Sequence, residues 1–105
     1  MVHPRRSLDP ALQTPLRLSL LAALGQDKEV EFGALRDFLD ADDSSLSKAV
    51  THLQKVGYVK TNKGYVGKRP RTWIQSTQQG RRALARHIDA LKTISRRTIE
   101  HDAAL

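Results

Sequence analysis

The spacing of apolar residues changes at Gly57, and this change restricts the folds that the chain can adopt. Over residues 43–56 apolar side chains recur at helical spacing, whereas along 58–63 and 72–76 they alternate with polar ones, as in a strand. Residues 64–71 join the two alternating runs and contain glycine and proline, which favour a connecting loop or a loop with strand ends. The pattern predicts a helix followed directly by a two-stranded hairpin.

Local start and stop signals predict further elements on both sides of this helix. Residues 14–24 begin with Thr-Pro and are followed by glycine, and residues 9–13 begin with Asp-Pro, so a helix and a shorter helical turn are expected there. Residues 30–32 favour a short strand and 33–39 a helix, and Thr77 caps a last helix. The side chains predicted to face inward from the helix over 33–39 are Leu35, Phe38 and Leu39. The apolar side chains that share one face of each of the next two helices are Leu46, Ala49, Val50, Leu53 and Val56, and Leu84, Ile88 and Leu91.

The predicted order is helix, strand, helix, helix, strand, strand, helix. It describes a mainly α fold with a small β-hairpin, in which a helix-turn-helix is followed by a wing. The length of 105 residues suits one domain, which we place at residues 9–97, with a flexible tail at 1–8 and a weakly ordered one at 98–105. In a winged helix of this kind, the second helix of the pair fits the DNA major groove and the hairpin reaches an adjacent groove or the phosphates.

The positive charge of the chain is concentrated in its second half. The formal net charge is +7. Residues 1–43 hold five basic and eight acidic side chains, whereas residues 44–97 hold thirteen basic side chains and the single acid Asp89. This polarity points to a polyanionic partner for the second half, and double-stranded DNA is the polyanion that suits the predicted fold.

Two clusters of side chains in that basic half are candidates for DNA contact. The exposed face of the helix over 43–56 carries hydroxyls and lysines but no acid, and such groups hydrogen-bond to base edges and phosphates. Its members are Ser44, Ser47, Lys48, Thr51 and Lys55, flanked by His52 and Gln54. The second cluster is the hairpin tip, where Lys68, Arg69 and Arg71 surround Pro70, whose ring stiffens the chain.

Five short motifs occur in an order that resembles the winged-helix transcriptional regulators of the MarR/ArsR-like group. They are Pro15-Leu16-Arg17-Leu18, Leu46-Ser47-Lys48 with Leu53, Gly57-Tyr58-Val59, Gly67-Lys68-Arg69-Pro70-Arg71-Thr72, and Thr77-Gln78-Gln79-Gly80-Arg81. The resemblance covers roughly residues 9–91 and is greatest for the small single-domain branch. In the turn before the second helix of the pair, Asp40 and Ala41 stand where the family usually has glycine and leucine.

The resemblance implies a homodimer that binds duplex DNA as a repressor or activator. By match, the recognition-helix positions are Ser45, Ser47, Lys48, Thr51 and His52, and the wing positions are Lys68, Arg69 and Arg71. The dimer would join through its terminal helices. The residues expected at that interface are Leu12, Leu18, Ala22, Ile88 and Leu91.

The sequence argues against several other classes of protein. Without cysteine there can be no disulfide and no thiolate metal site, and four scattered histidines do not make a metal site, so we expect neither metal nor cofactor. The serines near Lys48 have no accompanying base or acid pair, and no glycine-rich phosphate loop is present, so an enzyme is not expected. No apolar run is long enough for a membrane span, and the expected location is cytoplasmic. Nothing in the sequence points to a particular small-molecule effector.

Two other functions remain open at this level. The basic face could meet an acidic protein, which would make the chain a winged-helix protein-protein interaction module. Alternatively, the chain could be a non-specific architectural DNA binder, although the hydroxyl-rich helix face argues mildly against that because a face that reads only phosphates would carry more lysine.

Overall fold

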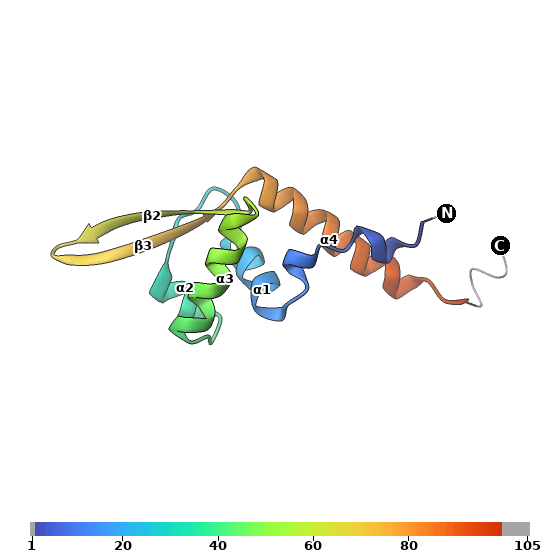
Figure 1. Cartoon of the computed structure of the whole chain (residues 1–105), viewed down its shortest axis with the longest axis horizontal. Coiled ribbons are helices and arrows are strands. Elements are labelled where there is room, and N and C mark those ends of the chain that lie inside the picture. The colour runs from blue at the N-terminus through green and yellow to red at the C-terminus, as the bar shows by residue number, and fades with distance from the viewer. Residues whose placement is uncertain (1, 100–105) are drawn as a thin grey trace.

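The computed structural model describes residues 2–99. Two short 3-10 helices, η1 (Pro4–Ser7) and η2 (Pro10–Leu12), precede α1 (Pro15–Leu24). The other elements follow in the order β1 (Val30–Glu31), α2 (Phe32–Phe38), α3 (Asp43–Lys55), β2 (Val59–Val66), β3 (Arg69–Ser76) and α4 (Gln78–Arg96). From α1 to α4 this confirms the predicted order. The molecule measures 65 × 25 × 19 Å, with the hairpin at one end and the last turns of α4 at the other (Figure 1).

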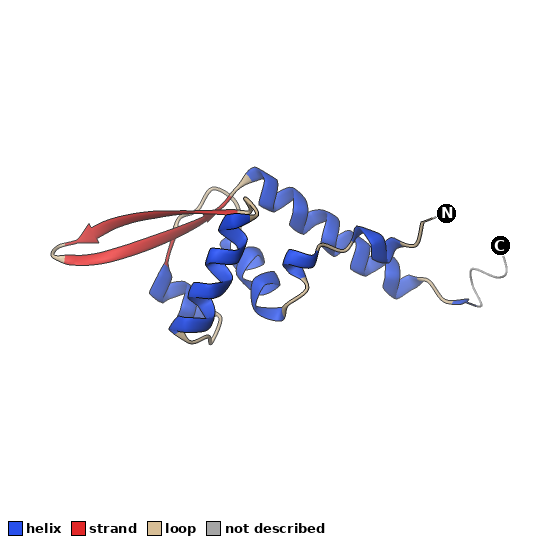
Figure 2. Cartoon of the chain, viewed as in Figure 1, coloured by secondary structure: helices blue, strands red, loops and turns tan. Residues whose placement is uncertain are grey.

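The three strands form an antiparallel sheet in the order β1-β3-β2. The hairpin register runs from Val59 opposite Ser76 to Val66 opposite Arg69, so only Gly67 and Lys68 form the turn. Of the two alternatives for residues 64–71, the structure confirms a loop with strand ends, because residues 64–66 belong to β2 and residues 69–71 to β3. Gly67 supplies the positive φ of 64° that a two-residue hairpin turn needs, and the ladder can continue to the tip (Figure 2).

Leucines from the helices and Ile74 of β3 form the core between the sheet and α1, α2 and α3. The fully buried side chains are Leu12, Leu20, Leu21, Leu24, Leu35, Leu46, Leu53 and Ile74. The prediction that Phe38 faces inward is wrong, since it is 77% exposed, and Val56 and Leu91, which were predicted on apolar helix faces, are each 39% exposed. Leu39 takes the inward position one turn after Leu35, and Val56 lies just beyond the end of α3, where the chain turns toward β2.

The predicted helix-start signals are the caps that the structure uses. Thr14 Oγ1 accepts a hydrogen bond from the Arg17 amide at 3.2 Å, and Thr77 Oγ1 accepts one from the Gly80 amide at 2.9 Å. Asp40 adopts a left-handed backbone with φ 51°, as expected for the residue that turns the chain between α2 and α3. These local interactions fix where each helix begins.

The start of α4 packs against the residue that precedes β2 without space for a side chain. A Cβ added to Gly80 would lie 2.2 Å from the carbonyl oxygen of Tyr58. That same carbonyl accepts a hydrogen bond from the Thr77 amide at 3.0 Å, and the Thr77 hydroxyl donates to the Gly57 carbonyl at 2.6 Å. The root of the hairpin is thereby held against the first turn of α4, and glycine at position 80 allows this close approach.

Asp9 joins the N-terminal segment to two distant parts of the chain. Its amide donates to His87 Nδ1 of α4 at 3.0 Å, and its carboxylate accepts a hydrogen bond from the Tyr58 hydroxyl. That carboxylate raises the pKa of Tyr58. Before Asp9, η1 lies beside α4, so part of the expected tail at residues 1–8 has regular structure (Figure 1). The tail's flexibility and the boundaries at 8 and 97 stay predictions, and residues 100–105 of the other expected tail lie outside the described residues.

Candidate nucleic-acid interface

Helix α3 exposes a polar face. All six predicted recognition-helix residues are exposed: Ser45, Ser47, Lys48, Thr51, His52 and Lys55. Five of these, all except Ser45, line one shallow hollow on the surface. The apolar side chains between them, including Leu46 and Leu53, are fully buried and hold α3 against the core. The polar face is therefore available to a partner over three turns of the helix.

The first turn of α3 is acidic and internally bonded. Asp42 caps the helix through a hydrogen bond from the Ser45 amide at 2.7 Å, which lowers the pKa of Asp42, and the Ser45 hydroxyl donates to the same carboxylate at 2.9 Å. The Asp43 carboxylate accepts a hydrogen bond from Arg36 of α2 at 2.8 Å. This end of α3 therefore has its positive dipole compensated by acids, and the residues left to attract phosphates are Lys48 and Lys55.

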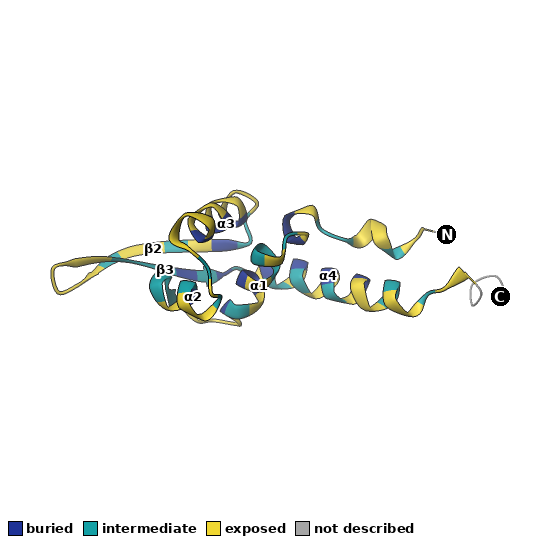
Figure 3. Ribbon diagram, turned by 90° about the horizontal axis from the view of Figure 1, so that it is seen from below, coloured by how far each residue is buried: buried dark blue, intermediate teal, exposed yellow. Residues whose placement is uncertain are grey.

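The hairpin projects beyond the helices and ends in exposed basic residues (Figure 3). Lys68 belongs to the two-residue turn and Arg69 begins β3, and both are exposed. Arg71 is different from these two. It lies opposite Gly64 within the ladder, its side chain is 37% exposed, and its guanidinium lies 3.9 Å from the Glu31 carboxylate. The prediction that all three residues sit at the tip is wrong for Arg71, because strand pairing extends to Arg69.

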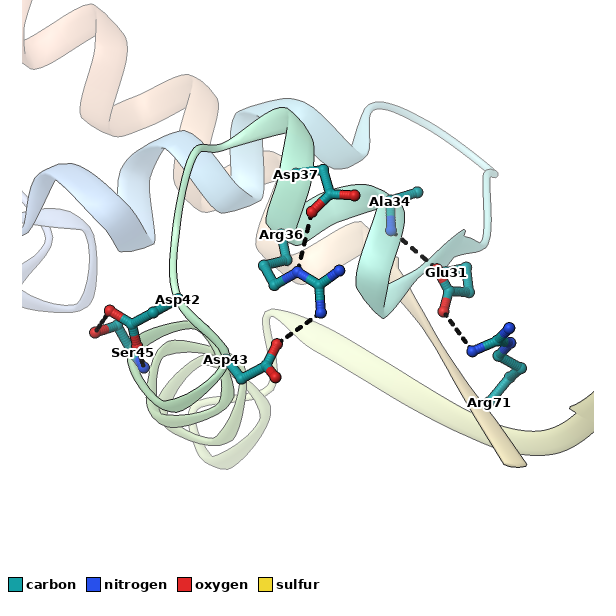
Figure 4. A network of polar contacts seen from close by, with 8 residues as sticks. All are labelled: Glu31, Ala34, Arg36, Asp37, Asp42, Asp43, Ser45 and Arg71. Atoms are coloured by element: carbon teal, nitrogen blue, oxygen red, sulfur yellow. Dashed lines mark hydrogen bonds and ion pairs between the residues drawn. The ribbon is translucent and has the colours of Figure 1, made fainter. Parts of the chain in front are cut away.

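Sequence reasoning missed Glu31 and the apolar residues near the wing tip. Glu31 contacts two elements at once: its carboxylate accepts a hydrogen bond from Ala34 of α2 at 2.9 Å and pairs with Arg71 of β3 (Figure 4). Tyr65 and Val66 are 73% and 58% exposed near the end of β2. The alternating pattern of a strand gives no sign of either role, since both depend on how far the hairpin extends from the core.

The residues predicted for a dimer interface occupy different environments. Leu12 is 1% exposed and belongs to the core of the single chain, so it leaves almost no surface for a partner. Leu18 and Ile88 are half-buried, whereas Ala22 is exposed and Leu91 is 39% exposed. Leu18 and Leu91 line one open apolar groove, together with Leu8, Leu12 and His87.

Residues 16–95 of the chain match a family described as the winged helix DNA-binding domain. The chain belongs to this family. An uncharacterized protein of Methanocaldococcus jannaschii is 30% identical over 81 residues, which cover 77% of this chain and 88% of that protein. The family assignment confirms the winged helix predicted from the sequence.

Solved structures of transcriptional regulators share the fold of this winged-helix protein. A transcriptional regulator homologue from Pyrococcus horikoshii superposes with a TM-score of 0.78 at 26% identity, covering 90% of this chain and 94% of that one. A MarR family transcriptional regulator from Streptomyces coelicolor, solved in complex with DNA, gives a TM-score of 0.64 at 25% identity, covering 96% of this chain and 71% of that one. The predicted resemblance to MarR-like regulators is confirmed.

Within residues 2–99, no group of three or more histidine, cysteine, aspartate or glutamate side chains could hold a metal ion. Over the same residues, no helix combines the length and the apolar character that a membrane crossing requires.

Proposed function

We propose that this winged-helix protein is a sequence-specific, double-stranded DNA-binding transcriptional regulator that acts as a homodimer. Helix α3 would enter the major groove, and the wing residues Lys68 and Arg69 would reach the adjacent minor groove or its phosphates. The observation that carries the proposal is the exposed face of α3, which is polar over its whole length and carries lysines and hydroxyls. The cytoplasmic location expected from the sequence stays a prediction.

The chemistry of the α3 face supports reading of bases as well as binding of phosphates. Thr51 and Ser47 offer hydroxyls that donate and accept, and the Thr51 methyl can contact the methyl group of thymine. Lys48 and Lys55 supply charge that acts on any sequence. A face that mixes these groups on an exposed helix suits recognition of particular base pairs, and it supports this reading over that of an architectural DNA binder.

Replacing Thr51 by alanine is expected to relax sequence preference without abolishing DNA binding. The wild-type protein should first be used to select bound fragments from genomic DNA, which would then be sequenced. Against the selected site, Thr51→Ala should lose about fivefold to twentyfold in affinity, which corresponds to the lower half of the range of about 1–3 kcal/mol for a good bidentate base contact. Against random-sequence duplex the two proteins should bind within about twofold of each other.

Lys48→Ala is the matched comparison for Thr51→Ala, because it removes a phosphate-seeking charge from the same helix face. It should weaken binding to the selected and random duplexes by similar factors, and it should make the slope of log affinity against log salt shallower. If Thr51→Ala lowered the affinity for both duplexes by the same factor, Thr51 would not read bases. Failure to enrich any sequence would contradict specificity, and wild-type binding to an acidic protein but not to duplex DNA would favour the protein-interaction alternative.

A homodimer is supported by apolar surface that the single chain leaves open between α1 and α4. Ala22 and Leu91 are exposed, Leu18 and Ile88 are half-buried, and an apolar groove runs between the two helices. A second copy packed there would double the number of recognition helices. Two such helices would fit successive major grooves if they stood about 34 Å apart, one turn of DNA.

The variant Leu91→Glu is expected to convert the dimer into a monomer. Light scattering should give the wild-type protein twice the chain mass of 11.8 kDa and the variant a single chain mass. A glutamate at this site would bury a charge without a partner in the proposed interface. Phe38→Glu is the control, since Phe38 is 77% exposed on α2, away from the groove, and this variant should remain dimeric. A monomeric wild-type protein at micromolar concentration would overturn the dimer.

A further inference from the structure

We propose that Glu31 is a positioning residue that restrains Arg71 at the base of the wing and thereby limits the attraction of the wing for DNA of any sequence. The inference rests on the proposed function. In the free protein the Glu31 carboxylate would occupy the guanidinium, and a DNA phosphate would have to compete with it. Glu31 would thus reduce the charge-driven, sequence-independent part of binding more than the part that reads bases.

The position of the pair in the sheet fixes the contact between Glu31 and Arg71. Glu31 pairs with Trp73 in the β1–β3 ladder, and Arg71 lies two residues before Trp73, so its side chain leaves the same face of the sheet. Glu31 Oε2 accepts the Ala34 amide at 2.9 Å as the cap of α2, which leaves Oε1 for the guanidinium at 3.9 Å. The hydrogen bond from the Ala34 amide, with smaller contributions from the Gly33 amide and from the charges of Arg71 and Arg36, lowers the pKa of Glu31, and the carboxylate is ionised at neutral pH.

The pair lies where a DNA strand would pass between the two grooves. Glu31 and Arg71 line an open hollow with Arg36 and Asp43, bounded by α2, the first turn of α3 and β3 (Figure 4). A duplex that received α3 in one groove and the wing in the next would have its phosphate backbone between these elements. Both arginines that line this hollow are paired with acids of the chain itself.

The two arginines of the hollow differ in how firmly they are held. Arg36 contacts two carboxylates, at 2.8 Å from Asp43 and 3.0 Å from Asp37. Arg71 has one ion pair at 3.9 Å, and the side chains of Arg71 and Glu31 are each about one-third exposed. An exposed ion pair of this length contributes little energy, so a phosphate can displace Glu31, whereas Arg36 stays in place and fixes α2 to α3.

The variant Glu31→Gln tests the inference because glutamine keeps an oxygen for the Ala34 amide but loses the charge. Its affinity for random-sequence duplex at low salt should rise about threefold or more, and the slope of log affinity against log salt should steepen by up to about one unit as Arg71 gains a phosphate. In an Arg71→Gln background, the same Glu31→Gln change should alter the affinity no more than Asp37→Asn does in the wild-type protein. Binding would be measured by fluorescence anisotropy over a series of salt concentrations.

Asp37→Asn is the matched control, since it removes one negative charge from the same region while Arg36 keeps Asp43. It should change the affinity by clearly less than Glu31→Gln does. If wild-type protein binds DNA and Glu31→Gln has equal effects with and without Arg71, or weakens binding, Glu31 acts only in folding and the inference is overturned. If wild-type protein binds no duplex DNA, the proposed function itself is overturned, and the inference with it.

Discussion

Replacing Gly80 by alanine is expected to lower the free energy of unfolding by about 2 kcal/mol or more and the Tm by about 10 °C or more. The added methyl group would lie 2.2 Å from the Tyr58 carbonyl oxygen and 2.9 Å from its carbonyl carbon. Both are backbone atoms, held by the hydrogen bond from the Thr77 amide, so they cannot move aside as a side chain would. Alanine favours a helix over glycine by only about 1 kcal/mol, which is less than the cost of this overlap.

The clash at Gly80 can be separated from helix propensity by a second variant on α4. Ala85 is exposed, and Ala85→Gly should cost about 1 kcal/mol through propensity alone. Thermal and urea unfolding of both variants would give the two free energies. If the Gly80→Ala protein is as stable as the wild type, the start of α4 can move away from Tyr58, and the contact between α4 and the hairpin root does not require glycine.

The double variant Lys68→Ala with Arg69→Ala is expected to weaken DNA binding by about tenfold to a hundredfold at moderate salt. The slope of log affinity against log salt should become shallower by about two units, because two phosphate contacts are lost. Both side chains are exposed at the wing tip and make no ion pair among the described residues, so stability should stay within about 0.5 kcal/mol of the wild type. Anisotropy titrations at several salt concentrations would give the affinities and the slope.

The control for the wing is a double variant with the same change in charge at a different place. Arg82 and Arg86 are exposed on α4, which points away from the hairpin (Figure 1). Arg82→Ala with Arg86→Ala should alter affinity much less than the wing variant does. Salt screens charges that lie farther from the DNA than a Debye length of about 8–10 Å, so charges that do not contact the DNA contribute little. Equal losses of affinity from the two double variants would mean that the wing residues contribute only to the overall positive potential of the protein and do not contact the DNA.

The helices could be predicted because the signals that begin and end them are local in sequence. Thr14, Asp42 and Thr77 each lie three residues before the amide that they cap, and Gly25 follows α1 with a positive φ. The polar face of α3 followed from the same periodicity, since the four buried residues of that helix leave only one side for solvent. Fold class and recognition helix therefore depend on patterns within one element.

The extent of the wing could not be predicted, because a hairpin that leaves the core has no buried face to impose alternation. Beyond Thr61 the residues of β2 are exposed or half-buried, and Tyr65 and Val66 are exposed side by side. The contacts of Arg71 with Glu31 and of Tyr58 with Asp9 join residues 40 or more positions apart, and no local pattern signals such a pair. They depend on the sheet register and on how the N-terminal segment crosses α4.

The sheet has three strands only at its root, so the outer part of the wing is a two-stranded ribbon whose tip moves when its base bends. Pairing with β1 ends at Trp73, so the four residue pairs from Lys63–Thr72 to Val66–Arg69 form a two-stranded ribbon. At about 3.3 Å per residue this ribbon reaches about 13 Å, and a bend of 10° at its base would carry Arg69 sideways by about 2 Å. In the proposed complex, a displacement of this size would be enough for Arg69 to meet grooves of slightly different width, while the three-stranded root keeps the base of the hairpin in place.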